Sequence, residues 1–123
     1  MSEEPGNVVV ASRIEPAELA RLAKRFFGDM VKIVVDIRRN IAAVGGELHA
    51  DAEQLLIEGG SRQEDLWGAN YYPGVGPAQC VETTALINIR PSQGNNGMDI
   101  EDEEIREAVS RVIFSLVGRG EAI

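Results

Sequence analysis

Two neighbouring segments with alternating apolar residues constrain the fold more than any other feature of the chain. In residues 31–37, valine or isoleucine at every second position predicts a strand with one buried face. Residues 41–48 have the character of a return strand, and residues 39–40 can supply a two-residue turn. This register places Lys32 opposite Glu47 and brings the apolar faces of both strands together. The sequence therefore predicts a β-hairpin with one face in the core.

Helix signals flank this hairpin on both sides. Pro16 suits the first turn of a helix whose apolar residues recur at helical spacing as far as Gly28. After the hairpin, Asp51 and Gln54 match a capping box that begins a short helix. Asp99 can cap a last helix, whose apolar stripe predicts one buried face. Three helices are therefore expected, of which the first and the last are the longer.

Two further strands are predicted between the short helix and the last one. Residues 66–72 form the third strand, which ends at Pro73. Residues 81–90 are the most strand-like run of the chain, and they end at Pro91, which cannot donate to a sheet ladder. Residues 8–10 are open to two interpretations, a short first strand or an extended arm.

This order of elements predicts a two-layer α+β domain. Its mainly antiparallel, four-stranded sheet is covered on one face by the two longer helices, and one short helix completes it. The length of 123 residues fits one domain, which we place at residues 8–119, after a flexible tail of residues 1–7. Gly45 and Gly46, inside the return strand, predict a bulge or a close approach of another backbone.

Charge and composition restrict the class of function. The net charge of −8 argues against nucleic acid and anionic membranes as partners, and it favours a protein partner or a homodimer. No apolar run approaches the roughly 20 residues that cross a membrane, and the acidic N-terminus is unlike a signal peptide. A single cysteine, Cys80, fits a reducing compartment, so we expect a cytoplasmic protein. Phosphate-loop and dinucleotide motifs are absent, and we expect no cofactor.

Three segments of the chain are similar to a known family. They are residues 44–51 (VGGELHAD), residues 60–70 (GSRQEDLWGAN) and residues 86–95 (LINIRPSQGN). Together they resemble a family of small uncharacterised prokaryotic proteins that is defined as a domain of unknown function. The similarity extends from about the first helix to the last. It implies a stable shared fold and brings no activity with it.

The first candidate site is a metal site. Glu47, His49 and Asp51 occur at every second position, so on an extended segment their side chains would point the same way. Asp36 of the neighbouring strand could add a carboxylate, and such Asp, Glu and His clusters hold divalent metals. In the alternative interpretation, Asp51 caps a helix and Glu47 pairs with Lys32.

Two further candidates are separate polar clusters that could bind a ligand, one around Trp67 (Gln63, Glu64, Asp65 and Asn70) and one around Arg90 (Asn88, Gln93 and Asn95), and the sequence leaves open whether they converge. Trp67 could stack on a planar ligand, although the sole tryptophan of a small domain is more often a packing residue. Arg90, with backbone amides of the following turn, could hold a carboxylate or phosphate. In the alternative interpretation, Arg90 pairs with a carboxylate such as Asp65 or Glu82. The predicted ligand-binding residues are Trp67, Asn88, Arg90, Gln93 and Asn95.

Two classes of function remain open from the sequence. The first is a non-catalytic binding or protein-interaction module, because no catalytic motif is present. The second is a small metal-assisted hydrolase or nuclease-like enzyme, with Glu47, His49 and Arg90 as catalytic candidates supported by Asp36 and Asn95. The enzyme hypothesis requires these side chains to converge in the folded protein.

Overall fold

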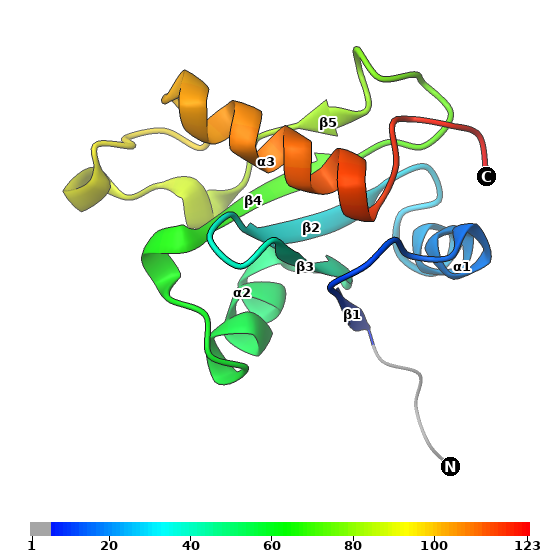
Figure 1. The fold of residues 1–123 in the computed structure, drawn as a ribbon, viewed down its shortest axis with the longest axis horizontal. Coiled ribbons are helices and arrows are strands. Elements are labelled where there is room, and N and C mark those ends of the chain that lie inside the picture. Colours follow the sequence, from blue (N-terminus) through cyan, green and yellow to red (C-terminus); the bar gives the residue numbers. More distant parts are fainter. Residues whose placement is uncertain (1–5) are drawn as a thin grey trace.

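The structure, a computed structural model, describes residues 6–123 as one antiparallel sheet with helices on both of its faces (Figure 1). The sheet has five strands in the order β1-β3-β2-β4-β5. Their bounds in this spatial order are β1 (Asn7–Val10), β3 (Ile41–Gly45), β2 (Val31–Asp36), β4 (Leu66–Tyr71) and β5 (Val81–Glu82). The α+β class is confirmed, and the predicted count of four strands is corrected to five because residues 7–10 pair with β3.

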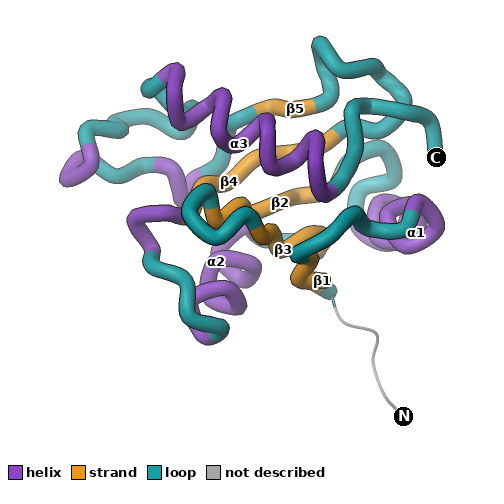
Figure 2. The backbone as a smooth tube through the Cα atoms, viewed as in Figure 1, coloured by secondary structure: helices purple, strands orange, loops and turns teal. Residues whose placement is uncertain are grey.

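The helices form two layers around the sheet, as the backbone trace in Figure 2 shows. Helices α1 (Pro16–Phe26) and α3 (Glu103–Leu116) cover one face, and α2 (His49–Glu58) covers the other. The predicted two-layer arrangement is therefore wrong. The reason is that the second face of the sheet is also apolar: Val34 and Ala43 are fully buried there. Apolar residues on both faces of a strand require cover on both sides.

The larger core lies between the sheet and the pair α1 and α3. Alternate strand residues, among them Ile33 and Val44, are fully buried against Leu22 of α1 and Val109 of α3. Burying one such aliphatic side chain contributes about 1.5–3 kcal/mol. This core confirms the predicted inner face of the hairpin.

The register of the hairpin differs from the prediction by two residues. Asp36 lies opposite Ile41, so the turn contains the four residues 37–40. A shift of two preserves which side chains face the core, because side chains alternate with a period of two. The β2–β3 ladder ends at Ile33 opposite Val44, so the predicted pairing of Lys32 with Glu47 is not formed. On the other edge of β2, Lys32 lies opposite Asn70 of β4.

The carboxylate of Asp36 sets this turn. Its Oδ1 atom accepts hydrogen bonds from the backbone N–H groups of Arg38 and Arg39, each at 2.9 Å. Asn40 has a φ of 55° and donates its N–H to the carbonyl of Asp36. An Asp that bonds to the backbone two residues later is a common way to close a turn. The four-residue turn is therefore specified by a side chain.

The predicted fourth strand, residues 81–90, is largely wrong. Only Val81–Glu82 pairs with β4, and the chain then leaves the sheet in a loop of residues 83–102, which we call the β5–α3 loop. The loop contains two short 3₁₀ turns, η2 (Leu86–Asn88) and η3 (Pro91–Gln93). The third predicted strand is confirmed to within one residue as β4.

Two predicted helix starts are also corrected. Helix α2 begins at His49 directly after Leu48, and no side chain caps it, so Asp51 lies inside the helix. Helix α3 is capped by Asp102, whose carboxylate accepts from the N–H groups of Glu104 and Ile105. Asp99 instead accepts from the hydroxyl of Thr83 within the β5–α3 loop. Several acidic residues lie near the start of each helix, and the sequence pattern does not show which of them is the cap residue.

The close approach predicted at Gly45 is present. Gly45 has a φ of 99°, and a Cβ atom there would lie 2.7 Å from the carbonyl oxygen of Gly6 and 3.0 Å from Leu22 Cδ2. A side chain at this position would be strained by its backbone conformation and would also displace β1.

We predict that Gly45→Ala lowers the free energy of unfolding by about 2–4 kcal/mol, because left-handed strain and a backbone clash add. The matched control is Gly74→Ala, at a φ of 85° with no atom within 4 Å of the added Cβ, which should cost only about 1–2 kcal/mol. Urea unfolding followed by tryptophan fluorescence measures both values. Equal losses would show that no close contact exists at Gly45.

Candidate functional site

The outer edge of β4 is completed by side chains where β5 stops. Gly68 of β4 donates its N–H to Asn88 Oδ1 at 2.8 Å, and its carbonyl accepts from Asn88 Nδ2 at 3.0 Å. Asn88 is fully buried. Its carboxamide thus makes the two hydrogen bonds that a neighbouring strand would make. This substitution explains why residues 83–90 can leave the sheet without leaving Gly68 unpaired.

Arg90 continues the same edge. This buried guanidinium donates to the backbone carbonyls of Leu66, Gln63 and Ile87. Burial lowers the pKa of Arg90, and the carboxylate of Glu53 at 3.6 Å opposes that shift. Glu53, from α2, therefore takes the place of the predicted partners Asp65 and Glu82.

The remaining members of the predicted ligand site also bond within the chain. Asn95 Nδ2 donates to the carbonyls of Asn88, Gly97 and Asp99, and its Oδ1 accepts from the N–H of Glu101.

Gln93 donates to the carbonyl of Glu64. Trp67 is 2 % exposed and packs in the core beneath the guanidinium of Arg90, 4.7 Å from its ring centre. The structure brings the clusters around Trp67 and Arg90 together, which the sequence left open, and their polar groups hold the β5–α3 loop against β4.

The predicted metal candidates lie apart. Asp36 is fully buried, and its Oδ2 accepts from the hydroxyl of Ser61, beyond the C-terminal end of α2. His49 is the first residue of α2 and bonds to the carbonyl of Ala69, so it lies roughly 10 Å farther along β4 than Asp36. Glu47 is exposed. Within residues 6–123, no group of three or more His, Cys, Asp and Glu side chains is placed to hold a metal ion.

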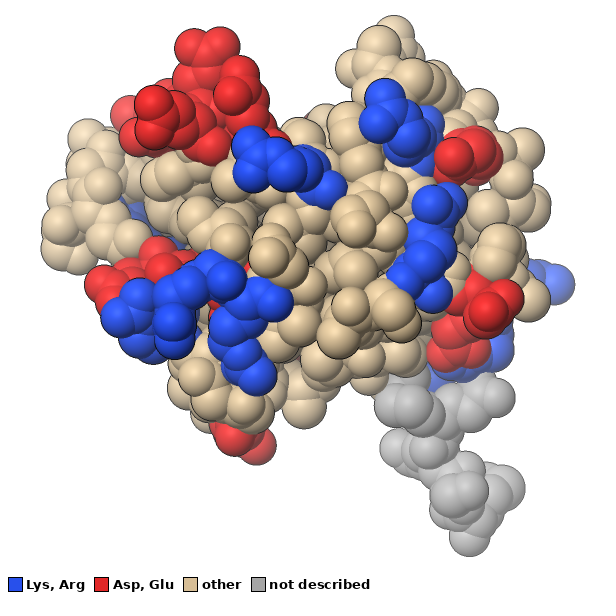
Figure 3. Space-filling view, in the orientation of Figure 1, with Lys and Arg blue, Asp and Glu red and all other residues tan. Residues whose placement is uncertain are grey.

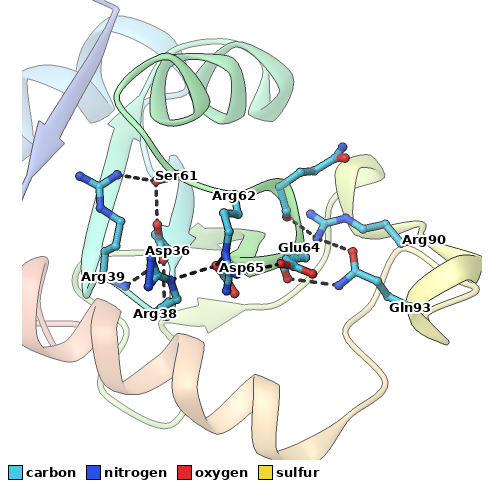
Figure 4. Close-up of polar contacts among 10 residues, drawn as sticks. Asp36, Arg38, Arg39, Ser61, Arg62, Glu64, Asp65, Arg90 and Gln93 are labelled. Carbon is cyan, nitrogen blue, oxygen red and sulfur yellow. Dashed lines mark hydrogen bonds and ion pairs between the residues drawn. The ribbon is translucent and has the colours of Figure 1, made fainter.

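Basic residues beside Asp36 form a network that is balanced in charge (Figure 4). Arg38 and Arg62 both contact the carboxylate of Asp65, at 3.6 Å and 3.0 Å, while Arg39 bonds to Ser61. On the face that α3 crosses, Figure 3 shows an acidic group at the upper left, a basic group at the lower left and groups of both signs on the right. Arg38 and Arg62 are thus paired with carboxylates, while the guanidinium of Arg39 bonds to Ser61 and to the carbonyl of Gly59.

A largely apolar groove lies on the opposite face of the sheet, the face that α2 covers. It lies between the start of α2, the end of β4 and the β5–α3 loop, and it has a volume of about 470 Å³. We call it the α2 groove. Its wall includes Leu48, Leu86 and Met98, whose side chains are 55 %, 71 % and 42 % exposed. Large apolar side chains that gather on a surface mark a binding site more often than isolated ones do.

Two residues that line the groove, His49 and Ala85, pack closely against Gly68 of β4. A Cβ atom on Gly68 would lie 2.6 Å from Ala85 Cβ and 3.2 Å from His49 Cδ2. The β5–α3 loop can therefore lie against β4 only because residue 68 lacks a side chain.

Few polar groups reach the α2 groove. They are Lys32, His49, Asn70 and Thr84. Burial lowers the pKa of His49; the hydrogen bond to Ala69 opposes this shift, and the positive charge of Lys32 adds to it. The neutral imidazole uses Nε2 as the donor to Ala69 and leaves Nδ1 as an acceptor.

Sequence reasoning placed His49 among the candidates and missed the rest of the groove. The alternating pattern places Leu86 within a strand and Leu48 at the end of another strand. An exposed leucine in a strand does not by itself indicate a binding site. The available signal was the presence of large apolar residues, Leu86 and Met98, in a segment otherwise rich in polar residues and glycine. That signal was hidden by the alternation of residues 81–90, which favoured a strand.

We predict that Asn88→Asp lowers the free energy of unfolding at pH 7 by about 3 kcal/mol, since a buried carboxylate cannot donate to Gly68. Protonation restores a donor, so the pKa of the introduced carboxyl is raised in the folded state. The loss should therefore shrink as the pH falls toward about 4. Urea unfolding at both pH values tests this. The exposed control Asn96→Asp should change stability by less than about 0.5 kcal/mol; a similar loss in both variants would contradict the proposed role of Asn88.

We also predict that the imidazole of His49, the single histidine of the chain, titrates below pH 6.5. The unfolded chain takes up a proton near its ordinary pKa of about 6.5, while the folded protein does not. Stability should therefore decrease as the pH falls from 7 to 5. A proton–carbon NMR titration of the ring Cε1 resonance gives the midpoint directly. A midpoint at or above 6.5 would show that the ring is not buried as described.

Comparison with known proteins places this architecture in a family. None of the helices in residues 6–123 is long and apolar enough to cross a membrane. No curated protein and no solved structure matches the chain. One family model does match, over residues 8–116, which include all three helices and the whole sheet except Asn7 of β1. The chain therefore belongs to the family described as protein of unknown function DUF5674.

Proposed function

We propose that the protein is a cytoplasmic, non-catalytic binding module whose binding site is the α2 groove. The observation that carries this proposal is the groove itself, an apolar cavity with only a few polar groups. Its volume of about 470 Å³ lies in the range of roughly 300–1,000 Å³ that is typical of small-molecule sites. A few polar groups in an apolar cavity are the usual means of orienting a ligand.

The dimensions of the groove favour a small molecule over a protein surface. Stable protein interfaces bury about 800 Å² on each partner and are broad and shallow. Three exposed apolar residues, Leu48, Leu86 and Met98, form the wall of this one cavity. We therefore place the ligand in the groove and treat a protein partner or homodimer as the secondary expectation from the acidic charge.

Observations that would favour the enzyme alternative are lacking among the described residues. Arg90 donates to three backbone carbonyls and is buried, so it has little freedom to bind a substrate. Burial raises the pKa of the Cys80 thiol, which disfavours a nucleophilic thiolate. His49 is separated from Asp36, and the side chain of Glu47 is exposed.

An NMR titration with 1-octanol, a neutral amphiphile, tests the binding site. In proton–nitrogen spectra of the labelled protein, shifts should concentrate in residues 48–50, 69–70 and 84–87 and at Met98. Leu86→Gln should weaken this binding about tenfold, because it replaces an apolar wall with a polar group. Val75→Gln is the matched control, since Val75 is 47 % exposed and lies outside the groove. Shifts spread over the whole surface, or equal effects of both variants, would contradict the proposal.

A further inference from the structure

We infer that the natural ligand of the α2 groove is an apolar chain that ends in a single carboxylate, and that Lys32 binds this carboxylate. The inference rests on the proposed function and specifies the chemistry of its ligand. It combines the apolar wall of the groove with the one cationic side chain in its lining.

Lys32 is held in the groove without an acidic partner. It lies on β2, is half-buried and faces the same side of the sheet as α2. Its ammonium lies 5.1 Å from the ring centre of Phe27, which positions the charge without neutralising it. Within the described part of the chain, no carboxylate lies within 4.0 Å of this ammonium.

This isolation is unusual for a protein with a net charge of −8. The carboxylate of Glu82 lies two strands away from Lys32, with Asn70 between them. That carboxylate already accepts hydrogen bonds from Asn70 at 2.8 Å and from the hydroxyl of Tyr72 at 3.3 Å. Lys32 is therefore the group in the groove that can pair with a negative charge on a ligand.

The rest of the lining is consistent with one carboxylate. The N-terminal turn of α2 lies at the groove, and no side chain caps it, so its partial positive charge has the same sign as Lys32. His49 is neutral at pH 7 and can accept at Nδ1, which gives the site only one full positive charge. A single lysine with no arginine suits a monoanion better than a doubly charged phosphate.

The apolar part of the ligand would lie along the wall. The side chains of Met30, Ile87 and Met98 provide flexible and branched surfaces that accept an alkyl chain without directional bonds. A medium-chain monocarboxylate therefore matches both ends of the groove.

Titrations with sodium octanoate and 1-octanol, which differ only at the head group, test this inference. Both probes are added at pH 7 and below the micelle concentration, and NMR shifts of groove residues report binding. The wild-type protein should bind octanoate about tenfold more tightly than octanol. Octyltrimethylammonium, the cationic counterpart, should bind more weakly than either.

Variants at Lys32 identify the group responsible. Lys32→Met keeps the apolar stem and should reduce octanoate affinity about tenfold, to the level of octanol, while leaving octanol binding unchanged. Lys32→Arg retains the charge and should preserve the preference for octanoate. Lys24→Met removes one exposed positive charge from α1 and serves as the control for net charge. An unchanged amide spectrum away from the groove confirms that each variant is folded.

The outcomes separate the two proposals. Equal binding of octanoate and octanol, or a preference that survives in Lys32→Met, would overturn the assignment of Lys32 and leave the groove as a binding site. Absence of binding by both probes would overturn the proposed function and this inference with it. A loss in Lys24→Met equal to that in Lys32→Met would assign the effect to the overall charge and reject a specific pairing.

Discussion

The pairing of the Asn88 carboxamide with Gly68 is the interaction on which the arrangement around the groove depends. A buried backbone N–H and carbonyl must be hydrogen-bonded, and β5 is too short to reach them. Because one side chain supplies both bonds, the chain leaves the sheet after two residues of β5. The β5–α3 loop that results forms one wall of the α2 groove.

Residues 44–51, 60–70 and 86–95, which we call the first, second and third segments, meet one another beside β4. His49 of the first segment bonds to Ala69 of the second, and Asn88 of the third bonds to Gly68 of the second. Arg90 and Gln93 bond to the backbone at Gln63 and Glu64. Their polar side chains therefore build the loop and its support. The apolar character of the groove comes from other residues, among them Leu48, Leu86 and Met98.

Hydrophobic periodicity predicted the parts of the fold that depend on local pattern. The inner face of the hairpin, β4 and the apolar stripe of α3 were all predicted correctly, because their apolar residues recur at the spacing that places them in a core. The same reasoning was wrong for residues 81–90. Their alternation satisfies a strand pattern, but Asn88 and Arg90 bond to β4 through their side chains, and no pattern of apolar residues distinguishes the two arrangements. The hairpin register was wrong by two for a similar reason, since Asp36 selects the turn through its carboxylate.

The sequence by itself determined the α+β class, the three helices and the buried face of the hairpin, and at Gly45 it limited the possibilities to a bulge or a close backbone approach. These follow from side-chain periodicity and from backbone limits that act within a few residues. Only the tertiary structure decided that the cluster around Arg90 is occupied by backbone carbonyls and that Leu48, Leu86 and Met98 gather beside Lys32. These outcomes depend on contacts between residues distant in the chain. Such contacts are set by the packing of α2 and the β5–α3 loop against the sheet.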